Sequence, residues 1–356
     1  MVAADLQILV SKISKSRISE IDIYHTKFGH KFSDHMFIAD FKDGEWRNLS
    51  IIPYAQISMS PATSVFHYGQ AIFEGMKAYK SDSGDVFLFR PWDNAERFNR
   101  SAARLCMPEV PKEIFMEGLM QLISLDRNWI PASDGSSLYI RPVMFSTDEF
   151  IGVKSSDSYK FIIITSPSGV YYKEPIRVKV ETHYTRACEG GTGSAKAAGN
   201  YAASLYPAKL AQQKGYHQII WTDAKEHKYI EESGTMNVMF VIGDTVVTPA
   251  LHDSILAGIT RDSVLTLARD WGMKVEERKI SVDEIVQAHK KGILKEAFGV
   301  GTAATIAQII SFNYNETDFQ LPPVEQREFS NKVSKTLTDI RRGKVKDKFG
   351  WMMKVE

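Results

Sequence analysis

Lys196 lies in a stretch of small residues, EGGTGSAKAAGNY (189–201), where a backbone segment or a planar ligand can approach closely. The residues alone leave two interpretations of this lysine open. It is either a solvated side chain on a glycine-rich turn, or a Schiff-base lysine whose amine is desolvated by close packing. A phosphate-binding P-loop is excluded in its usual form, because Ala197 follows the lysine where that motif has serine or threonine.

Two further segments could complete a site for a phosphorylated pyridine cofactor such as pyridoxal phosphate. Glu231 and Glu232 precede the turn 233–235, where a buried carboxylate would keep a pyridine nitrogen protonated. The alternative is that both glutamates are solvated at a strand edge. A glycine turn before Thr260 leads into a predicted helix, whose first N–H groups could bind a phosphate or could belong to an ordinary helix start. The small-residue turn at 299–304 is not GxGxxG, so it predicts no dinucleotide site.

Tyr139 and Arg141 are two residues apart in the predicted strand 138–142, so both side chains point to the same face. An arginine in a pocket would bind an acidic substrate through two hydrogen bonds, whereas a surface arginine is more often the solvated partner of a carboxylate. The nine histidines include no HExxH motif and no paired cysteine–histidine spacing, so we predict no metal site.

The elements that must position these residues follow from hydrophobic periodicity and from turn residues. We predict strands at 85–90, 159–165 and 176–180, and helices at 91–104, 201–214 and 260–271. We also predict a hairpin of 237–242 with 245–248 around Gly243-Asp244, and a helix opened by the capping box Ser281-x-x-Glu284. Strands and helices mixed with hairpins indicate an α+β or mixed α/β fold.

The length of 356 residues predicts two domains, at roughly 150 residues per domain. We place a smaller N-terminal α/β domain at 1–165 and a linker at 166–176, where Ser-Pro-Ser-Gly interrupts the pattern. A larger C-terminal domain that carries the lysine then extends over 177–356.

Charge, hydropathy and cysteine content exclude several classes of protein. The formal net charge is +1, and no apolar run reaches the roughly 20 residues of a membrane span, so we expect no nucleic-acid partner and no membrane. Two cysteines, Cys106 and Cys188, are too few for a disulfide framework, and we expect Cys106 to be buried. Because Asp5 and Glu20 lie in the N-terminal segment, we expect a cytoplasmic protein without a targeting leader.

Seven motifs between about Phe66 and Ile309 resemble those of the branched-chain amino-acid aminotransferases. This family shares the pyridoxal-phosphate fold type IV with D-amino-acid aminotransferase and aminodeoxychorismate lyase. The motifs are, in order, FHYGQAIFEGMKAYK, LFRPWDNAERFNRSAARL, LYIRP, GGTGSAKAAGNYAASL, YIEESGTMNVMF, GITRDSVLTLA and GVGTAA. The resemblance implies a two-domain fold type IV architecture and a homodimer with its active sites at the subunit interface.

The resemblance also implies a role for each matching residue. Lys196 forms the Schiff base and moves a proton between the substrate and the cofactor, Glu232 faces the pyridine nitrogen, and Tyr201 binds the phenolic oxygen. The phosphate is bound by Arg97, Ile259, Thr260 and Thr302. The substrate is bound by Tyr68 of the neighbouring subunit, Phe73, Tyr139, Arg141, Thr235 and Ala303. Of these, Arg141 and Tyr68 recognise the second carboxylate of glutamate.

We therefore expect an aminotransferase that moves the amino group of L-leucine, L-isoleucine or L-valine to 2-oxoglutarate in two half-reactions. The alternative on the same fold is a D-amino-acid aminotransferase or a lyase. The alternative from another class is a non-catalytic binding protein with a degraded site, which the presence of Lys196, Glu232, Arg97 and Tyr201 argues against. One departure from the family is Ala257, where proline is usual, and it predicts a looser turn before the phosphate-binding helix.

Overall fold

The computed structural model describes residues 7–169, 171–172 and 174–356, and it divides the chain into two compact units. Unit 1 comprises the chain up to Tyr171, the short segment Ala195–Ala198 and the C-terminal Thr338–Glu356. Unit 2 comprises Tyr172–Ser194 and Gly199–Leu337. Of the N-terminal segment in which we expect no targeting leader, residues 1–6 lie outside the described part of the chain.

Unit 1 is built on a sheet with the strand order β1-β3-β2-β8-β7-β5-β6-β18, and β4 also pairs with β7. Its strands are β1 Leu9–Val10, β2 His35–Lys42, β3 Glu45–Pro53, β4 Ala71–Phe73, β5 Met76–Lys80, β6 Val86–Phe89, β7 Ser137–Ser146, β8 Tyr159–Ser168 and β18 Met352–Val355. Its helices are α1 Ser64–Tyr68, α2 Pro91–Arg104 and α3 Lys112–Leu125, with the 3₁₀ turns η1 Ile18–Glu20 and η2 Arg127–Trp129.

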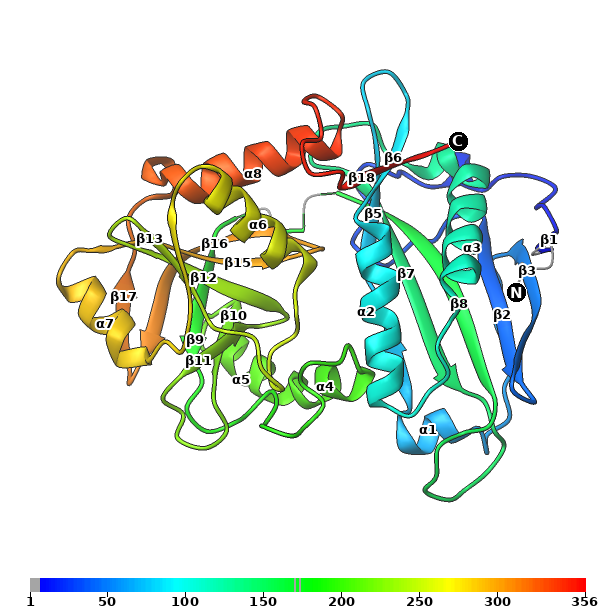
Figure 1. Ribbon diagram of the computed structural model, residues 1–356, viewed down its shortest axis with the longest axis horizontal. Coiled ribbons are helices and arrows are strands. Elements are labelled where there is room, and N and C mark those ends of the chain that lie inside the picture. The colour runs from blue at the N-terminus through cyan, green and yellow to red at the C-terminus, as the bar shows by residue number, and fades with distance from the viewer. Residues whose placement is uncertain (1–6, 170, 173) are drawn as a thin grey trace. The chain divides into compact units, whose positions relative to one another are not determined.

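Helices α2 and α3 cover one face of the unit 1 sheet (Figure 1). Helix α2 begins at Pro91, whose fixed φ suits the first helical position. Ala95, Phe98 and Ala102 then recur at helical spacing and are buried against the sheet. The core of unit 1 therefore lies between these two helices and the sheet.

Unit 2 is built on a second sheet with the order β11-β10-β9-β16-β15-β12-β13-β14, to which β17 is added beside β16. Its strands are β9 Ile176–Val180, β10 Gln218–Thr222, β11 Ile230–Ser233, β12 Met236–Ile242, β13 Thr245–Thr248, β14 Lys274–Glu277, β15 Leu294–Gly301, β16 Thr305–Tyr314 and β17 Thr317–Gln320. Its helices are α4 Ala198–Ala203, α5 Leu205–Gln213, α6 Ile259–Asp270, α7 Val282–Lys290 and most of α8 Glu328–Arg341, with the 3₁₀ turn η3 Val324–Gln326.

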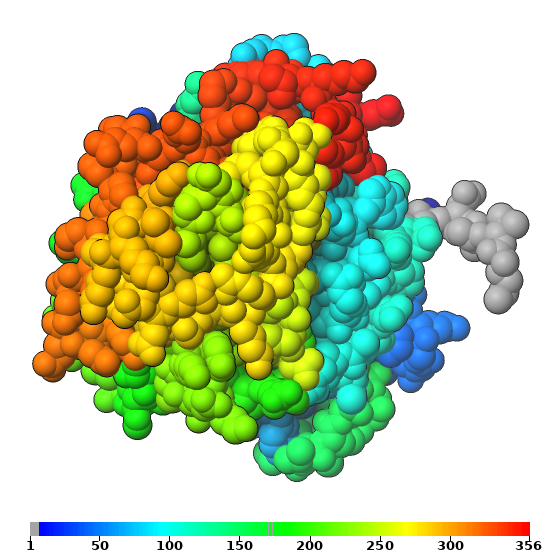
Figure 2. Space-filling model, turned by 60° about the vertical axis from the view of Figure 1, so that its left-hand side comes forward, coloured from blue at the N-terminus to red at the C-terminus, as the bar shows by residue number. Residues whose placement is uncertain are grey.

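Helix α6 packs on β14 and β15, helix α7 packs on β15, and helix α5 packs on β10. The residues coloured yellow, which include α6, lie at the surface of unit 2 in the view of Figure 2. The apolar side of α7 belongs to the same core cluster as strands β9, β12 and β16. The core of unit 2 is therefore separate from the core of unit 1.

Several sequence predictions are confirmed, because local signals determine these elements. Helix α2 has the predicted bounds, and β12 and β13 pair around Gly243-Asp244 as predicted. Ser281 accepts a hydrogen bond from the Glu284 N–H at 3.0 Å, which is the predicted cap of α7. The mixture of sheets and helices matches the expected fold class.

The predicted helix 201–214 is two helices, α4 and α5, which break at Ser204. Pro207 explains the break, because it has no N–H to donate and is tolerated only in the first turn of a helix, here the first turn of α5. The expected burial of Cys106 is wrong, since Cys106 is exposed. Its positive φ of 53° turns the chain away directly after α2.

The observed division of the chain also differs from the expected domains. Ser166, Pro167 and Ser168 belong to β8 rather than to a linker. Strand β2 pairs with β8 only as far as Ile163, so the missing N–H of Pro167 leaves no strand partner unsatisfied on that side. Within the range 177–356, Ala195–Ala198 and the C-terminal residues belong to unit 1, the latter because β18 pairs with β6.

Candidate active site

Lys196 lies in the short segment Ala195–Ala198 of unit 1, beside β4 and α2. The Phe73 N–H donates to the Lys196 carbonyl oxygen at 3.1 Å, and the Lys196 N–H donates to Ser101 Oγ at 2.9 Å. The ammonium nitrogen Nζ lies 4.7 Å from the centroid of the Phe73 ring. The main chain of Lys196 is therefore fixed on both sides, while its amine lies over an aromatic face.

The same Phe73 ring is contacted by Arg141 from β7. The guanidinium carbon of Arg141 lies 4.5 Å from the Phe73 centroid and 5.3 Å from the Tyr139 centroid, and Nη2 donates to the Tyr139 hydroxyl at 2.9 Å. Among the described residues, the buried Nε of Arg141 has no hydrogen-bond partner. Unit 1 therefore brings four predicted site residues together, because Lys196 and Arg141 both lie over the Phe73 ring and Tyr139 contacts Arg141.

Phe28 adds an apolar wall to this group, and sequence reasoning missed it. Its ring lies edge-on to Tyr139, with the two centroids 4.7 Å apart, and edge-on to Tyr171 at 5.1 Å. Phe28 precedes β2 in a segment without regular structure. No periodic pattern marks such a residue, so no local signal could have identified it.

Arg97 on α2 forms a buried ion pair with Glu74, the residue that follows β4. Nε and Nη2 of Arg97 donate to the two carboxylate oxygens of Glu74 at 2.7 and 2.8 Å. Glu74 is fully buried, and the Gly75 N–H donates to one of the same oxygens at 3.1 Å. The guanidinium expected at the phosphate is thus oriented by a carboxylate that sequence reasoning did not assign to the site.

In unit 2, Glu232 is a buried carboxylate on β11 that is held by three different groups. Oε1 accepts from the Leu256 N–H at 2.8 Å, and the amide of Asn237 lies 3.5 Å away. The other carboxylate oxygen of Glu232, Oε2, lies 3.1 Å from Nε of Arg186. The cation of Arg186 and the Leu256 N–H both favour the ionised carboxylate, which is the form that a protonated pyridine nitrogen requires.

Helix α6 begins directly after Gly258, and its first residues are Ile259 and Thr260. No side chain of the described residues caps this N-terminus, which suits an anionic ligand. A Cβ atom on Gly258 would fall 1.9 Å from Oδ1 of Asn237, so any larger residue there would force the Asn237 side chain to move. A buried, ion-paired carboxylate and a helix N-terminus without a side-chain cap are the two groups that a phosphorylated pyridine needs, and the residues of unit 2 fit such a cofactor.

The small residues before Lys196 have a packing role of their own. A Cβ atom on Gly193 would lie 2.5 Å from the Cα atom of Ser254 and 2.6 Å from Cβ of Ala187. The Ser194 N–H also donates to the Asp253 carbonyl oxygen at 2.7 Å. Close approach of two backbone segments, rather than of a ligand, therefore explains glycine at position 193.

The other predicted residues lie on turns and helix ends. In unit 2, Tyr201 is on α4, Thr235 is in the turn between β11 and β12, and Thr302 and Ala303 are in the turn between β15 and β16. In unit 1, Tyr68 ends α1 and is 40% exposed. The structure places each of these residues on a loop or helix end without assigning it a ligand.

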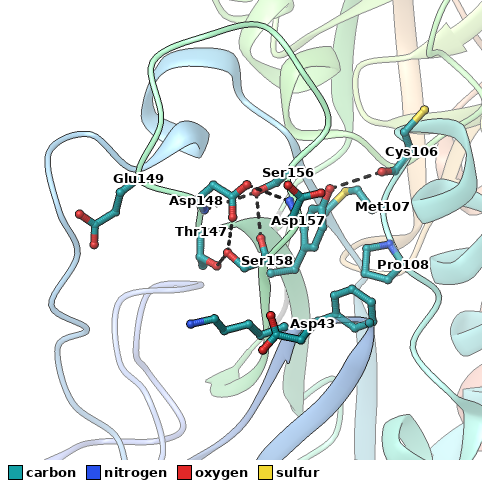
Figure 3. A pocket seen from close by; sticks show the side chains of 14 residues that line it. Asp43, Cys106, Met107, Pro108, Thr147, Asp148, Glu149, Ser156, Asp157 and Ser158 are labelled. Carbon is teal, nitrogen blue, oxygen red and sulfur yellow. Dashed lines mark hydrogen bonds between the residues drawn. The ribbon is translucent and has the colours of Figure 1, made fainter.

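A pocket of about 890 Å³ in unit 1 is lined by the β2–β3 turn, the segment after α2 and the β7–β8 connection (Figure 3). None of the predicted site residues lines it. Asp148 accepts hydrogen bonds from the Asp157 N–H at 2.8 Å and from the Ser158 hydroxyl at 2.5 Å. Burial opposes ionisation, but these hydrogen bonds lower the pKa of Asp148 below its ordinary value. The Asp148 carboxylate thus stabilises the β7–β8 connection.

Among the described residues, no group of three or more histidine, cysteine, aspartate or glutamate side chains is arranged to hold a metal ion. Among those residues, no helix is long and apolar enough to cross a bilayer.

Comparison with known proteins identifies the family. Residues 71–312 match the family described as amino-transferase class IV. The branched-chain-amino-acid aminotransferase 2 of Bacillus subtilis (strain 168) is 47% identical over 348 residues, which cover 97% of this chain and 96% of that protein. The chain therefore belongs to the class IV aminotransferases, and this full-length relative places it among the branched-chain amino-acid aminotransferases.

Solved structures agree with this assignment. The branched-chain aminotransferase of Thermoproteus uzoniensis, crystallised with norvaline, superposes with a TM-score of 0.76 at 26% identity and covers 90% of this chain and 100% of its own. The branched-chain amino acid aminotransferase of Escherichia coli gives a TM-score of 0.74 at 26% identity, with 91% and 99% covered. The family, the enzyme class and the fold type expected from the seven motifs are confirmed.

Proposed function

We propose that the chain transfers the amino group of L-leucine, L-isoleucine or L-valine to 2-oxoglutarate. The observation that carries this proposal is the group around Phe73, where the Lys196 amine and the Arg141 guanidinium lie over the same ring. Such a group offers both an apolar surface and a cation next to the candidate lysine. One pocket must hold an aliphatic side chain in one half-reaction and a second carboxylate in the other, and this arrangement supports both.

The cofactor is pyridoxal 5′-phosphate, as in class IV aminotransferases, and when bound it supplies an electron sink for the bond broken at the substrate Cα. We propose that Lys196 binds it covalently and moves the proton at Cα. Glu232, held ionised by Arg186, keeps the pyridine nitrogen protonated, and Tyr201 donates to the phenolic oxygen. The phosphate is bound by the charge of Arg97, the N–H groups of Ile259 and Thr260, and Thr302.

The two substrate types are distinguished by the polarity of the side-chain pocket. Phe28, Phe73 and the ring of Tyr139 favour an aliphatic side chain through apolar contact. Arg141 is oriented by the Tyr139 hydroxyl, and its buried Nε has no partner among the described residues. A substrate carboxylate would satisfy that donor, which supports Arg141 as the group that recognises 2-oxoglutarate. Thr235 and Ala303 are proposed to line the remainder of the substrate site.

We further propose a homodimer in which Tyr68 acts in the neighbouring subunit's site. Large apolar side chains are exposed at the end of α1 and on the β7–β8 connection, where Phe66 is 62%, Ile151 70% and Val153 91% exposed. Exposed apolar side chains of this kind are typical of a surface that a partner covers. The cysteines form no disulfide in the described chain, which is compatible with a reducing cytoplasm.

An absorption experiment tests this function. Purified protein should show a visible band of covalently bound cofactor, which L-leucine removes and 2-oxoglutarate restores. Lys196→Ala should abolish the band and reduce turnover by several orders of magnitude, because the covalent and acid–base roles are lost together. The exposed Lys209 on α5 provides the control, since Lys209→Ala should retain both.

Two results would contradict the proposal. Faster turnover of D-alanine than of L-leucine would favour a D-amino-acid aminotransferase, the alternative on the same fold. Absence of any cofactor band in the wild-type protein would favour a binding protein without catalysis.

A further inference from the structure

Glu231, the neighbour of Glu232 on β11, is a buried acid that the proposed function does not use. It is 4% exposed, and its Oε1 accepts a short hydrogen bond from the Ser254 hydroxyl. Its other oxygen, Oε2, is buried and has no hydrogen-bond partner among the described residues. Burial raises the pKa of Glu231, while the Ser254 hydrogen bond and the charges of His252 and Arg186 oppose the rise.

Glu231 is connected to the surface by two side chains of the segment before α6. His252 Nδ1 lies 3.2 Å from the Ser254 hydroxyl oxygen, and His252 Nε2 lies 3.8 Å from Glu231 Oε1. The His252 side chain is 43% exposed, so it exchanges protons with solvent. A proton on Nδ1 can pass to Ser254 Oγ as the hydroxyl proton passes to Glu231, which leaves the serine unchanged.

Ser254 also connects Glu231 to the Glu232 ion pair. Its hydroxyl donates to Glu231, while its carbonyl oxygen accepts a short hydrogen bond from Nη2 of Arg186. Nε of that same guanidinium lies 3.1 Å from Glu232 Oε2. Ionisation of Glu231 therefore adds a negative charge beside the cation that balances Glu232.

Two acidic residues lie in the segments that hold Glu231. Asp223, at the end of β10, raises the pKa of Glu231 through its charge. Asp253, next to Ser254, accepts a hydrogen bond from the Gly190 N–H at 3.3 Å. Burial and the charge of Asp223 favour the protonated form of Glu231, whereas the Ser254 hydrogen bond and the charges of His252 and Arg186 favour the ionised form.

We propose that Glu231 is a positioning residue that exchanges protons with solvent through Ser254 and His252 and thereby controls how strongly Arg186 balances the charge of Glu232. When Glu231 is neutral, Arg186 acts on Glu232 alone. When Glu231 is ionised, Arg186 acts on two carboxylates, so that Glu232 presents more negative charge to a pyridine nitrogen. The inference rests on the proposed role of Glu232.

A pH titration of the visible absorption of the bound cofactor tests this inference without measuring activity. The wild-type holoenzyme should show a transition from Glu231 in addition to the transition of the cofactor itself. Glu231→Gln keeps the size of the side chain and its bond with Ser254 but cannot ionise, so the additional transition should disappear. Ser254→Ala and His252→Gln remove groups that favour ionised Glu231, so each should move the transition to higher pH by roughly half a unit.

Glu232→Gln distinguishes failure of this inference from failure of the proposed function. If Glu232→Gln leaves the spectrum and its titration unchanged, the assignment of Glu232 is wrong and the inference fails with it. If Glu232→Gln alters them but Glu231→Gln retains the full wild-type curve, only the inference is overturned. Should Glu231→Gln fail to fold, the surface variant His252→Gln decides, and a curve identical to that of the wild type overturns the inference.

Discussion

The ion pair between Glu74 and Arg97 gives a prediction about stability that is independent of any ligand. Glu74→Gln keeps the volume of the side chain but removes its charge, so the buried guanidinium of Arg97 loses the carboxylate to which it is paired. Both side chains are at most 6% exposed, and two hydrogen bonds of 2.7 and 2.8 Å join them. Breaking a buried pair from one side costs about 3–5 kcal/mol, because the remaining charge keeps its desolvation penalty.

Thermal unfolding of the purified protein measures this cost. At about 2–4 °C per kcal/mol for a unit of this size, the lower limit of about 3 kcal/mol predicts a fall in the midpoint of roughly 6–12 °C. Glu96→Gln on the same helix α2 is the matched control. Glu96 lies 3.8 Å from Arg100, and both side chains are nearly 60% exposed, so the change should cost less than about 1 kcal/mol. Equal midpoints for the two variants would refute the reasoning.

Two further predictions concern other residues of unit 1. Arg141→Met should reduce kcat/KM for 2-oxoglutarate by about 100-fold, because a lost charge-assisted pair is worth about 3 kcal/mol. The same change should alter the L-leucine half-reaction by less than tenfold. Equal losses in single-turnover assays of the two half-reactions would show that Arg141 is structural. Burial and the charge of Arg341 lower the pKa of Lys77 from 10.5 to about 7. Between these values only the unfolded chain binds the proton, so stability should rise with pH across that window. In urea unfolding at pH 7 and pH 9, Lys77→Met should weaken that rise and Lys80→Met should not.

Sequence patterns predicted those elements that local chemistry determines. Pro91 at a helix start, Gly243-Asp244 in a hairpin and Ser281 at a cap each act within a few residues, and each was found where the pattern placed it. The linker predicted at Ser166-Pro167-Ser168 is instead the end of β8. Proline is typical of linkers, but it is also tolerated in a strand where the neighbouring strand on one side, here β2, no longer pairs.

The partners of the candidate site residues could not be predicted in the same way. Glu74 and Arg97 are 23 residues apart on different elements, and no spacing rule relates a residue after β4 to a position on α2. Arg186 and Glu232 likewise come from segments that only the folded unit 2 brings together. The types of the candidate residues indicated a cofactor site. The pairing of each charged residue with its counter-ion, however, depends on tertiary packing.

The division of unit 1 along the chain has a consequence for the order of events during synthesis. Most of this unit has left the ribosome before Lys196 is made, so β4 and α2 can be in place when the short segment Ala195–Ala198 arrives. The sheet, however, stays open at one edge until β18 has been made, because β18 pairs with β6. A nascent chain therefore exposes the edge of β6 until Met352–Val355 have been synthesised, and truncation just before Met352 would make that exposure permanent.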